Sequence, residues 1–368
     1  ECIMSLFGET EYLNSVVELD DITDEISKIF DYDFDGNSQF KVPDMPEVES
    51  SFGIGVIVGP SGTGKSTLLK KFGNEYTYDW NPNKAIVSHF PDAKTAAKML
   101  GAVGLNSVPT WTKPYHVLST GEKHRADMAR CLRSGAVVDE FTSVVDRTVA
   151  ISLACAMGRY VKKFDVKNVV LATCHYDILE WLEPDWVYDL ATETLTRGCQ
   201  RRPNIKFTLE ESSTKVWKYF SNHHYLSGNI NKGVRCWIGW WEDRPIGFSS
   251  VISMPTGTIK NAWREHRIVI CPDYQGLGFG PRMSEATGEI MLSEGKKYYS
   301  KTANIRLGGY RNQSKKWRNT SHNMKTRKDY LKELYNSVKR RKDSKLSVEH
   351  LIKHADRLCY SHEYIGLK

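Results

Sequence analysis

The sequence predicts an α/β protein with two domains and a basic C-terminal tail. In residues 1–200, short apolar runs alternate with helical patterns, which is typical of a largely parallel sheet. In residues 201–310, two neighbouring strand-like runs precede a glycine-rich loop and a helical pattern, which indicates a mixed α/β domain. Residues 311–368 form a strongly basic extension, which we expect to be helical. The length of 368 residues allows this organisation, because a domain usually spans about 100–200 residues.

The first domain begins with an acidic stretch and continues into its core strands. We expect residues 1–50 to form strands and loops that lie against the first core. The run 52–58 predicts a buried strand that ends in a glycine-rich turn, and 66–73 predicts the helix that follows. Further strands are expected at 84–87, 136–138 and 169–172.

The second domain begins after a cluster of glycine, proline and charged residues at 197–203. A helical pattern at 214–220 comes first, and a later one is expected at 283–292. The strands are expected at 234–240, 246–252 and 266–270, with a turn at 242–245.

Charge is distributed unevenly along the chain. The net charge is +7, but residues 1–200 hold 19 Lys+Arg against 29 Asp+Glu, and residues 201–368 hold 32 against 15. The two halves are therefore −10 and +17, and the basic half favours a polyanionic partner.

The composition also bears on the compartment. No apolar run reaches the ~18 residues of a membrane span, and no signal peptide is recognisable. The eight cysteines are scattered without a Cys-x-x-Cys pair, which argues against a zinc site or a disulfide framework. We expect the protein to be located in the cytoplasm of a bacterial or phage-infected cell and not in a membrane.

The strongest motif is GPSGTGKST at 59–67, which lies between a predicted strand and a predicted helix. Glycines allow the backbone to wrap phosphates, so that N–H groups and the helix N-terminus face the anion. Lys65 is expected to reach the β- and γ-phosphates of ATP, and Ser66 to bind Mg²⁺. The other expected nucleotide contacts in the loop are Gly59, Ser61, Gly62, Gly64 and Thr67.

Two carboxylates follow the apolar run 136–138. Asp139 is expected to hold Mg²⁺ directly or through water, and Glu140 to polarise the attacking water as a general base. An acidic strand end is common, but with the phosphate loop it predicts a nucleotide-hydrolysing site.

Three further segments narrow the class of ATPase. LSTGEKHR at 118–125 precedes a helix, SVVD at 143–146 follows Glu140, and VLATCH at 170–175 ends in His175. In this order they resemble the signature, D-loop and switch-histidine segments of ABC ATPases. The resemblance implies an ATP-dependent head-to-tail homodimer, in which Ser119 and Gly121 close over the nucleotide at the partner's Lys65. It also implies that His175 senses the γ-phosphate during hydrolysis.

The chain departs from that family at two places. His89 stands where a glutamine is usual, which puts metal coordination through this loop in doubt. Only 28 residues separate His89 from Leu118, fewer than in the helical subdomain of transporters. We therefore expect a soluble ATPase and not an exporter.

In the second domain, a strand with Ile268, Val269 and Ile270 leads to a loop that suits a pyrophosphate at a helix N-terminus. The loop resembles the acetyl-CoA loop of GNAT acetyltransferases, whose backbone binds the pyrophosphate while the strand pairs with the pantetheine arm. The resemblance implies that the residues that bind the cofactor in this sequence are Gln275, Gly276, Leu277, Gly278, Phe279 and Gly280. A dinucleotide-binding fold is the competing interpretation. It is disfavoured because this domain does not begin with the strand–loop–helix of that fold and has no suitable acidic residue downstream of the loop.

A narrower resemblance concerns the acceptor. HHYLSG at 223–228, HR at 266–267 and WR at 317–318 are similar to phage GNAT domains related to the Mom DNA-modification protein. A general base is needed to take the acceptor's proton. Glu265 and His224 are the preferred candidates, and the others are His223, Tyr225 and Tyr299.

The tail favours nucleic acid, with DNA preferred to RNA. Residues 311–346 hold 13 Lys+Arg and 3 Asp+Glu, which suits contacts with phosphates. The aromatic residues interleaved with this charge suit base stacking; they are Tyr310, Trp317, Tyr330 and Tyr335. A solvated amphipathic helix remains an alternative for the same residues.

Three functions remain open at this stage. The first is an ATPase coupled to acetyl-CoA-dependent acyl transfer onto nucleic acid. The second is a nucleic-acid-binding ATPase switch whose GNAT-like domain only binds. The third is an acetyltransferase for a protein or a small-molecule amine.

Overall fold

The computed structural model describes residues 12–198, 202–224, 229–257, 259–326 and 357–367. The chain separates into two compact units. The first unit contains Glu1–Tyr78 and Arg130–Pro203, and the second contains Asp79–Ala129 and Asn204–Lys368. The expected boundary at 197–203 therefore coincides with a division between units. The segment 79–129, which we expected in the first domain, is grouped with the second unit.

The first unit is built on a five-stranded sheet in the order β4-β5-β3-β6-β7. β4 (Val137–Val138), β5 (Val169–Thr173), β3 (Ile54–Val58) and β6 (Trp186–Asp189) are parallel, and β7 (Thr194–Arg197) is antiparallel. The helices are α2 (Lys65–Leu69), η1 (Lys70–Phe72), α6 (Arg147–Phe164) and α7 (Leu179–Leu182). This arrangement confirms the predicted α/β class for the first unit.

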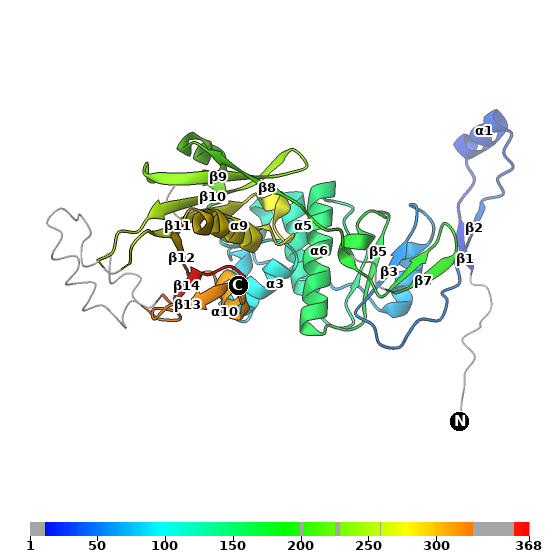
Figure 1. The fold of residues 1–368 in the computed structure, drawn as a ribbon. Coiled ribbons are helices and arrows are strands. Elements are labelled where there is room, and N and C mark those ends of the chain that lie inside the picture. The colour runs from blue at the N-terminus through cyan, green and yellow to red at the C-terminus, as the bar shows by residue number, and fades with distance from the viewer. Residues whose placement is uncertain (1–11, 199–201, 225–228, 258, 327–356, 368) are drawn as a thin grey trace, which may run out of the picture. The chain divides into compact units, whose positions relative to one another are not determined.

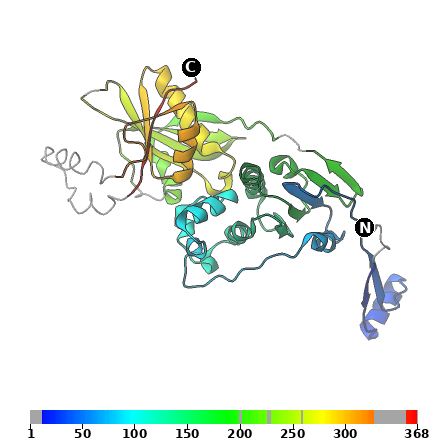
Figure 2. The ribbon, with the colours of Figure 1, turned by 90° about the horizontal axis from the view of Figure 1, so that it is seen from below.

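The N-terminal residues differ from the expectation. β1 (Tyr12–Val16) and β2 (Asn37–Lys41) form an antiparallel ribbon, and α1 (Asp21–Phe30) lies between them in the chain. No residue of α1 is buried, and Figures 1 and 2 show this helix at the far end of the ribbon. Among residues 12–50, those that pack on the core cluster of this sheet lie at the end of β2 and after it: Phe40, Val42, Met45 and Val48. The expectation that residues 1–50 lie against the core is therefore wrong for α1.

The segment at the start of the second unit is helical. It contains η2 (Ile86–His89), α3 (Ala93–Ala102), α4 (Val108–Trp111), η3 (Tyr115–Val117) and the first part of α5 (Thr120–Cys131). The predicted strand at 84–87 is wrong, because η2 occupies this place. The His89 ring is 3.0 Å from the Ala85 carbonyl, and it turns the chain back on itself where a strand would have continued.

The second unit contains a seven-stranded sheet in the order β13-β14-β12-β11-β10-β9-β8. Its strands are β8 (Thr208–Ser212), β9 (Val234–Trp241), β10 (Arg244–Ser253), β11 (Ala262–Ile270), β12 (Lys297–Thr302), β13 (Trp317–Asn319) and β14 (Tyr360–Tyr364). Only β11 and β12 pair in parallel. The predicted strands and turn of this domain are confirmed, and the sheet is mixed as expected.

Helices accompany this sheet on its connections. They are η4 (Thr214–Val216), α8 (Trp217–Phe220), η5 (Ser221–His223), η6 (Pro272–Tyr274), α9 (Phe279–Ser293) and α10 (Ile305–Gln313). α9 lies along β10 and β11 in Figure 1. The helix expected at 283–292 therefore begins four residues earlier, directly after the glycine-rich loop.

The described part of the tail belongs to the sheet. β13 and β14 extend it beyond β12, and Trp317 is 6% exposed in a core cluster with Tyr298 and Tyr364. Stacking of nucleic-acid bases on Trp317 is therefore excluded in this fold, which corrects the expectation from sequence. Tyr330 and Tyr335 lie outside the described residues. Among the residues that the structure describes, no helix is both long and apolar enough to cross a membrane.

Candidate functional site

The phosphate loop, the acidic pair and His175 each follow a neighbouring parallel strand of the first unit. The loop follows β3, Asp139 and Glu140 follow β4, and His175 comes soon after β5. Since carboxyl ends of parallel strands meet at one edge of the sheet, these groups are gathered there. The expected chemical groups are thus on one side of one sheet.

The phosphate loop has the backbone that a phosphate cradle requires. Gly64 is the N-cap of α2 with φ of 89°, a left-handed conformation that glycine adopts without strain. No side chain caps the helix, so its first N–H groups are available to an anion. The Lys65 ammonium donates to the carbonyls of Gly59 at 2.9 Å and Pro60 at 2.6 Å, which holds the side chain along the loop. Ser61, Gly62 and Ser66 are exposed, so the loop presents these residues to solvent.

An aromatic residue that the sequence did not identify lies against this loop. A Cβ built on Gly64 would be 3.0 Å from the Phe40 ring. Phe40 is half-buried at the end of β2. No local sequence pattern marks it, because 23 residues, including β3, lie between it and Gly64 in the chain.

The acidic pair and His175 are each held by their own hydrogen bonds. Glu140 has φ of 48°, its N–H donates to Asp139 Oδ1 at 2.8 Å, and its carboxylate accepts from Ser143. His175 Nδ1 lies 2.9 Å from the Thr142 hydroxyl, and the His175 N–H donates to Thr173 Oγ1 at 3.1 Å. Thr142 is fully buried, so it fixes the ring orientation. Sequence reasoning missed Thr142, although it stands two residues after Glu140.

Burial and the nearby Arg147 lower the pKa of His175, and Glu140 opposes this shift. The ring is therefore neutral near pH 7. With Nδ1 engaged by Thr142, Nε2 is the ring atom left to face a γ-phosphate.

Ser119 and Gly121 belong to the second unit, where they form the start of α5. The Ser119 N–H donates to the Glu122 carboxylate at 3.0 Å, and the Glu122 N–H donates to Ser119 Oγ at 3.3 Å, as in a capping box. Gly121 accepts a hydrogen bond from Arg125 at 3.2 Å. The motif is therefore preorganised as a helix N-terminus, which suits a phosphate.

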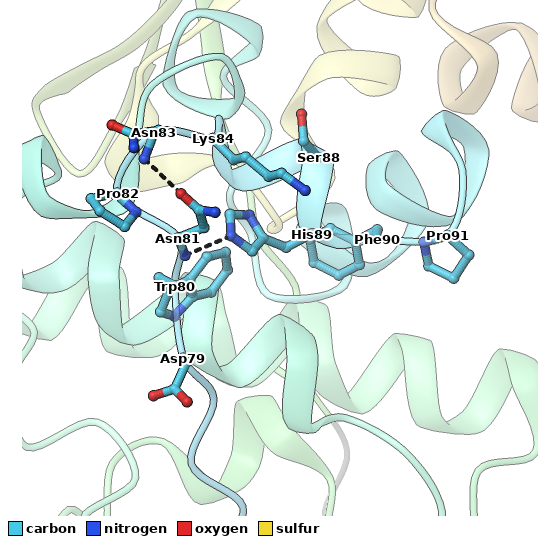
Figure 3. A pocket seen from close by; sticks show the side chains of 10 residues that line it. All are labelled: Asp79, Trp80, Asn81, Pro82, Asn83, Lys84, Ser88, His89, Phe90 and Pro91. Carbon is cyan, nitrogen blue, oxygen red and sulfur yellow. Dashed lines mark hydrogen bonds between the residues drawn. The ribbon is translucent and has the colours of Figure 1, made fainter.

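His89 is engaged within its own loop. Its Nε2 accepts from the Asn81 N–H at 3.0 Å, its Nδ1 faces the Ala85 carbonyl, and its ring contacts Trp80 edge-on (Figure 3). Both ring nitrogens are therefore used, and His89 does not offer a metal ligand in this conformation. The loop surrounds an open hollow of about 810 Å³, lined by Asp79, Trp80, Asn81, Pro82, Asn83, Lys84, Ser88, His89, Phe90 and Pro91.

The glycine-rich loop of the second unit forms another cradle. Gly276 and Gly278 have φ of 108° and 82°, and Gly278 is the N-cap of α9 without any side-chain cap. The buried side chains of Leu277 and Phe279 anchor the loop, so it is the backbone that is presented. Gln275 Nε2 donates to the Ile270 carbonyl at 2.9 Å, which ties the loop to the end of β11. These residues fit the pyrophosphate of a coenzyme A thioester.

Comparison with solved structures gives two kinds of likeness. A Bacillus subtilis acetyltransferase in complex with CoA has 14% identity and a TM-score of 0.30. The match covers 45% of this chain and 100% of the acetyltransferase chain. An ATP-binding cassette in a dimeric post-hydrolysis state with ADP and Pi has 16% identity and a TM-score of 0.32, covering 46% of this chain and 91% of its own. The ribosomal-protein-S18-alanine N-acetyltransferase of Escherichia coli has 10% identity and a TM-score of 0.28, covering 44% and 96%.

No protein-family model matches the chain, and no curated protein matches it. The solved structures thus include both of the folds expected from the motifs. Identities and TM-scores this low establish neither an activity nor a substrate for this chain.

Glu265, a preferred candidate for the general base, is buried in an ion pair. Its carboxylate accepts from Arg311 at 2.9 Å, Ser284 at 2.6 Å, Tyr298 at 3.1 Å and Ser300 at 3.0 Å. Burial raises the pKa of Glu265, but Arg311 and the hydroxyl donors outweigh burial and leave the pKa lowered. A carboxylate with four donors and a low pKa is a structural anion, and it is poorly suited to accept an acceptor's proton.

The other candidate bases lie in different surroundings. His224 is half-buried and contacts Trp217 edge-on at 5.8 Å, whereas His223 is exposed at the end of η5. Burial, with Glu363 next, raises the pKa of Tyr299, which disfavours its phenolate. Tyr225 lies outside the described residues. Among the predicted bases, His224 is thus the one that the structure leaves in a suitable environment.

Proposed function

We propose that this chain is an ATP-hydrolysing ABC-type ATPase coupled to an acyltransferase that uses acetyl-CoA to modify a nucleic acid. The observation that carries the proposal is the presence of two phosphate cradles. One precedes α2 beside the acidic pair, and the other precedes α9 at the end of β11. Two cradles of this kind, each on its own sheet, favour two phosphate-bearing ligands.

For hydrolysis, each residue has a role that its position supports. Lys65 and the loop N–H groups hold the phosphates, while Ser66 and Asp139 would hold Mg²⁺. Mg²⁺ would neutralise charge on the phosphates. Glu140 orients and polarises the attacking water, and His175 contacts the γ-phosphate through Nε2. Phe40 is our candidate for stacking on the adenine ring.

The dimer follows from the ABC-like motifs. Ser119 and Gly121 at the N-terminus of α5 would bind the γ-phosphate held by the partner's Lys65. Binding of ATP would close two chains head to tail, and hydrolysis would reopen them. This gives the ATPase a mechanical output, which we propose positions the second unit on its acceptor.

For transfer, the backbone of residues 275–280 would bind the pyrophosphate of acetyl-CoA. Ile268, Val269 and Ile270 would pair with the pantetheine arm, because this end of β11 has no paired neighbour on the β12 side among the described residues. The acceptor would attack the acetyl carbonyl from the other side, with His224 nearby. Leu277 and Phe279 support the loop from below.

The nucleic-acid acceptor rests on charge and on the Mom-like segments. Residues 201–368 carry a net charge of +17, which favours a polyanion over a small amine. The segments 223–228 and 266–267 favour DNA over RNA by resemblance. Because Trp317 is buried, the described part of the tail would bind nucleic acid mainly through contacts with its phosphates.

One observation favours a second function. Because Glu265 is taken up in a buried ion pair, the second unit lacks the carboxylate base that we expected. The chain would then be an ATP-driven nucleic-acid switch, in which the second unit binds acetyl-CoA without transferring its acyl group.

The deciding experiment is mass spectrometry of nucleosides after incubation of DNA or tRNA with the protein, ATP, Mg²⁺ and labelled acetyl-CoA. A labelled nucleoside would support the transferase and identify DNA or RNA. Intact ATP hydrolysis and acetyl-CoA binding without any label would favour the switch. A control with the Lys65→Ala variant tests whether transfer requires ATP.

A further inference from the structure

β11 contains an irregularity next to the proposed acyl-transfer site. In its antiparallel pairing with β10, Val251 lies opposite Glu265 and Ser250 lies opposite Arg267. His266 therefore has no residue opposite it, which is the geometry of a β-bulge. A bulge redirects a side chain and leaves one residue outside the ladder, and bulges are frequent beside active sites.

The other edge of β11 opens at the same place. β12 pairs with β11 only along Ala262, Trp263 and Arg264. From Glu265 to Ile270, β11 has no ladder partner on the β12 side among the described residues, and this stretch leads to the loop at 275–280. His266 thus lies on the stretch of β11 that does not pair with β12, where the pantetheine arm of the proposed acetyl-CoA would run.

The side chains of Glu265 and His266, which are neighbours in the chain at this bulge, have opposite environments. Every donor around the Glu265 carboxylate is used inside the protein. In contrast, His266 Nε2 is buried and has no hydrogen-bond partner. Leaving a buried polar atom unsatisfied is costly, so such an atom calls for a functional explanation. A bound acceptor would supply the missing donor.

We propose that His266 is the general base of acyl transfer, accepting through Nε2 the proton that the acceptor amine loses. The proposal rests on the transferase function above. The amine nitrogen attacks the acetyl carbonyl, a C–N bond forms and the thioester C–S bond breaks. The electron pair of that bond leaves with the sulfur, the amine proton passes to His266, and the sulfur takes a proton to give free coenzyme A.

The charges around His266 connect the base to the kind of acceptor. Burial is the largest cause that lowers the pKa of His266, followed by Arg267, Arg264 and His224, and together they bring it to about 4. The ring is therefore neutral at pH 7, as a proton acceptor must be. When the phosphates of a nucleic acid neutralise Arg264 and Arg267, their repulsion falls and the pKa of His266 rises, while burial, the largest cause of the low pKa, remains. The base would strengthen only when an anionic acceptor is bound.

The test compares His266→Gln with His116→Gln, which changes an exposed histidine of the same unit, and with His224→Gln. We expect His266→Gln to bind acetyl-CoA by calorimetry like the wild type but to lose transfer about 100-fold or more at pH 7, as removal of a general base does. The low-pH limb of the wild-type pH–rate profile should disappear in this variant. His116→Gln should change transfer less than threefold.

The outcomes separate this inference from the function on which it rests. Absence of acetyl-CoA binding to the wild type would refute the transferase itself. Transfer by His266→Gln within threefold of the wild type, or a larger loss in His224→Gln, would refute the role of His266 alone.

A second measurement applies if no acceptor has been found. The ring resonances of His266, assigned by difference with the Gln variant, should report a neutral ring down to pH 5. They should also shift when acetyl-CoA and a mixed-sequence DNA 12-mer are added. A ring that is protonated at pH 6, or that is unaffected by both ligands, would overturn the proposal.

Discussion

Replacement of Arg311 by methionine tests whether Glu265 is a structural anion. The Arg311 side chain is 1% exposed and that of Glu265 is 7% exposed, and the two form the only ion pair of either residue in the described part of the chain. Arg311→Met would approximate the packing volume but remove the guanidinium over Trp317 and leave a buried carboxylate without its cation. Breaking a buried pair in this way costs about 3–5 kcal/mol.

The assay is hydrogen exchange of the full chain, followed by mass spectrometry of peptides from β11 and β12. Exchange reports local opening, which matters here because two units need not unfold together. The free energy of opening of these strands should fall by about 3–5 kcal/mol in Arg311→Met. Arg318→Met is the matched control, because Arg318 is 64% exposed and solvent screens its pair with Glu363, so its loss should change opening little.

The dependence on pH gives this prediction a second part. The lowered pKa of Glu265 contributes stability above its ordinary value of 4.5, and this stability is lost as the pH falls through the folded-state pKa. In Arg311→Met, burial without the cation raises the pKa, so the variant protonates Glu265 first. The difference between the two proteins should therefore shrink as the pH falls from the raised pKa of Glu265 in the variant to its lowered pKa in the wild type. A loss under about 1 kcal/mol at pH 7 would refute the structural role and restore Glu265 as a candidate base.

Three further predictions concern the ligands. Glu140→Gln should abolish ATP hydrolysis and trap an ATP-bound dimer, and a variant that stays monomeric with ATP in light scattering would contradict the proposed dimer. Gly278→Glu should abolish acetyl-CoA binding in calorimetry, because it strains a left-handed N-cap and places a carboxylate beside the pyrophosphate, whereas Gly257→Glu, in open space, should bind normally. The affinity for DNA should fall steeply with salt, by about 0.9 log units per log unit of salt for each phosphate contacted, and a flat dependence would count against a nucleic-acid acceptor.

Much of the nucleotide site was predictable because its chemistry is local in the chain. The residues 59–67 form a cradle through their own backbone, and glycine at position 64 is required there by a positive φ. The same holds for the loop 275–280, whose glycines mark the start of α9. Parallel-strand order could also be anticipated, since it follows from alternating strands and helices, and it places Glu140 and His175 at one sheet edge.

Some local patterns were misleading because other parts of the chain decided their structure. The apolar run at 84–87 is typical of a strand, but hydrogen bonds from His89 fold it into a 3₁₀ turn. The apolar residues of α1 indicate contact with a core, yet Ile22 and Phe30 are each 70% exposed. The aromatic residue Trp317 stands in a basic stretch that favours stacking on bases, but β14 and β12 enclose it.

The sequence alone determined that this chain carries two phosphate cradles, two α/β units and a basic second half. Those properties depend on the order of neighbouring residues and on summed charge, which need no fold to be recognised. Only the tertiary structure decided that Glu265 is paired with Arg311, 46 residues away, and that His175 is oriented by Thr142, 33 residues away. Burial and hydrogen-bond partners are set by contacts between distant segments. The availability of a titratable side chain for chemistry is therefore decided by the fold, because it depends on those partners more than on residue type.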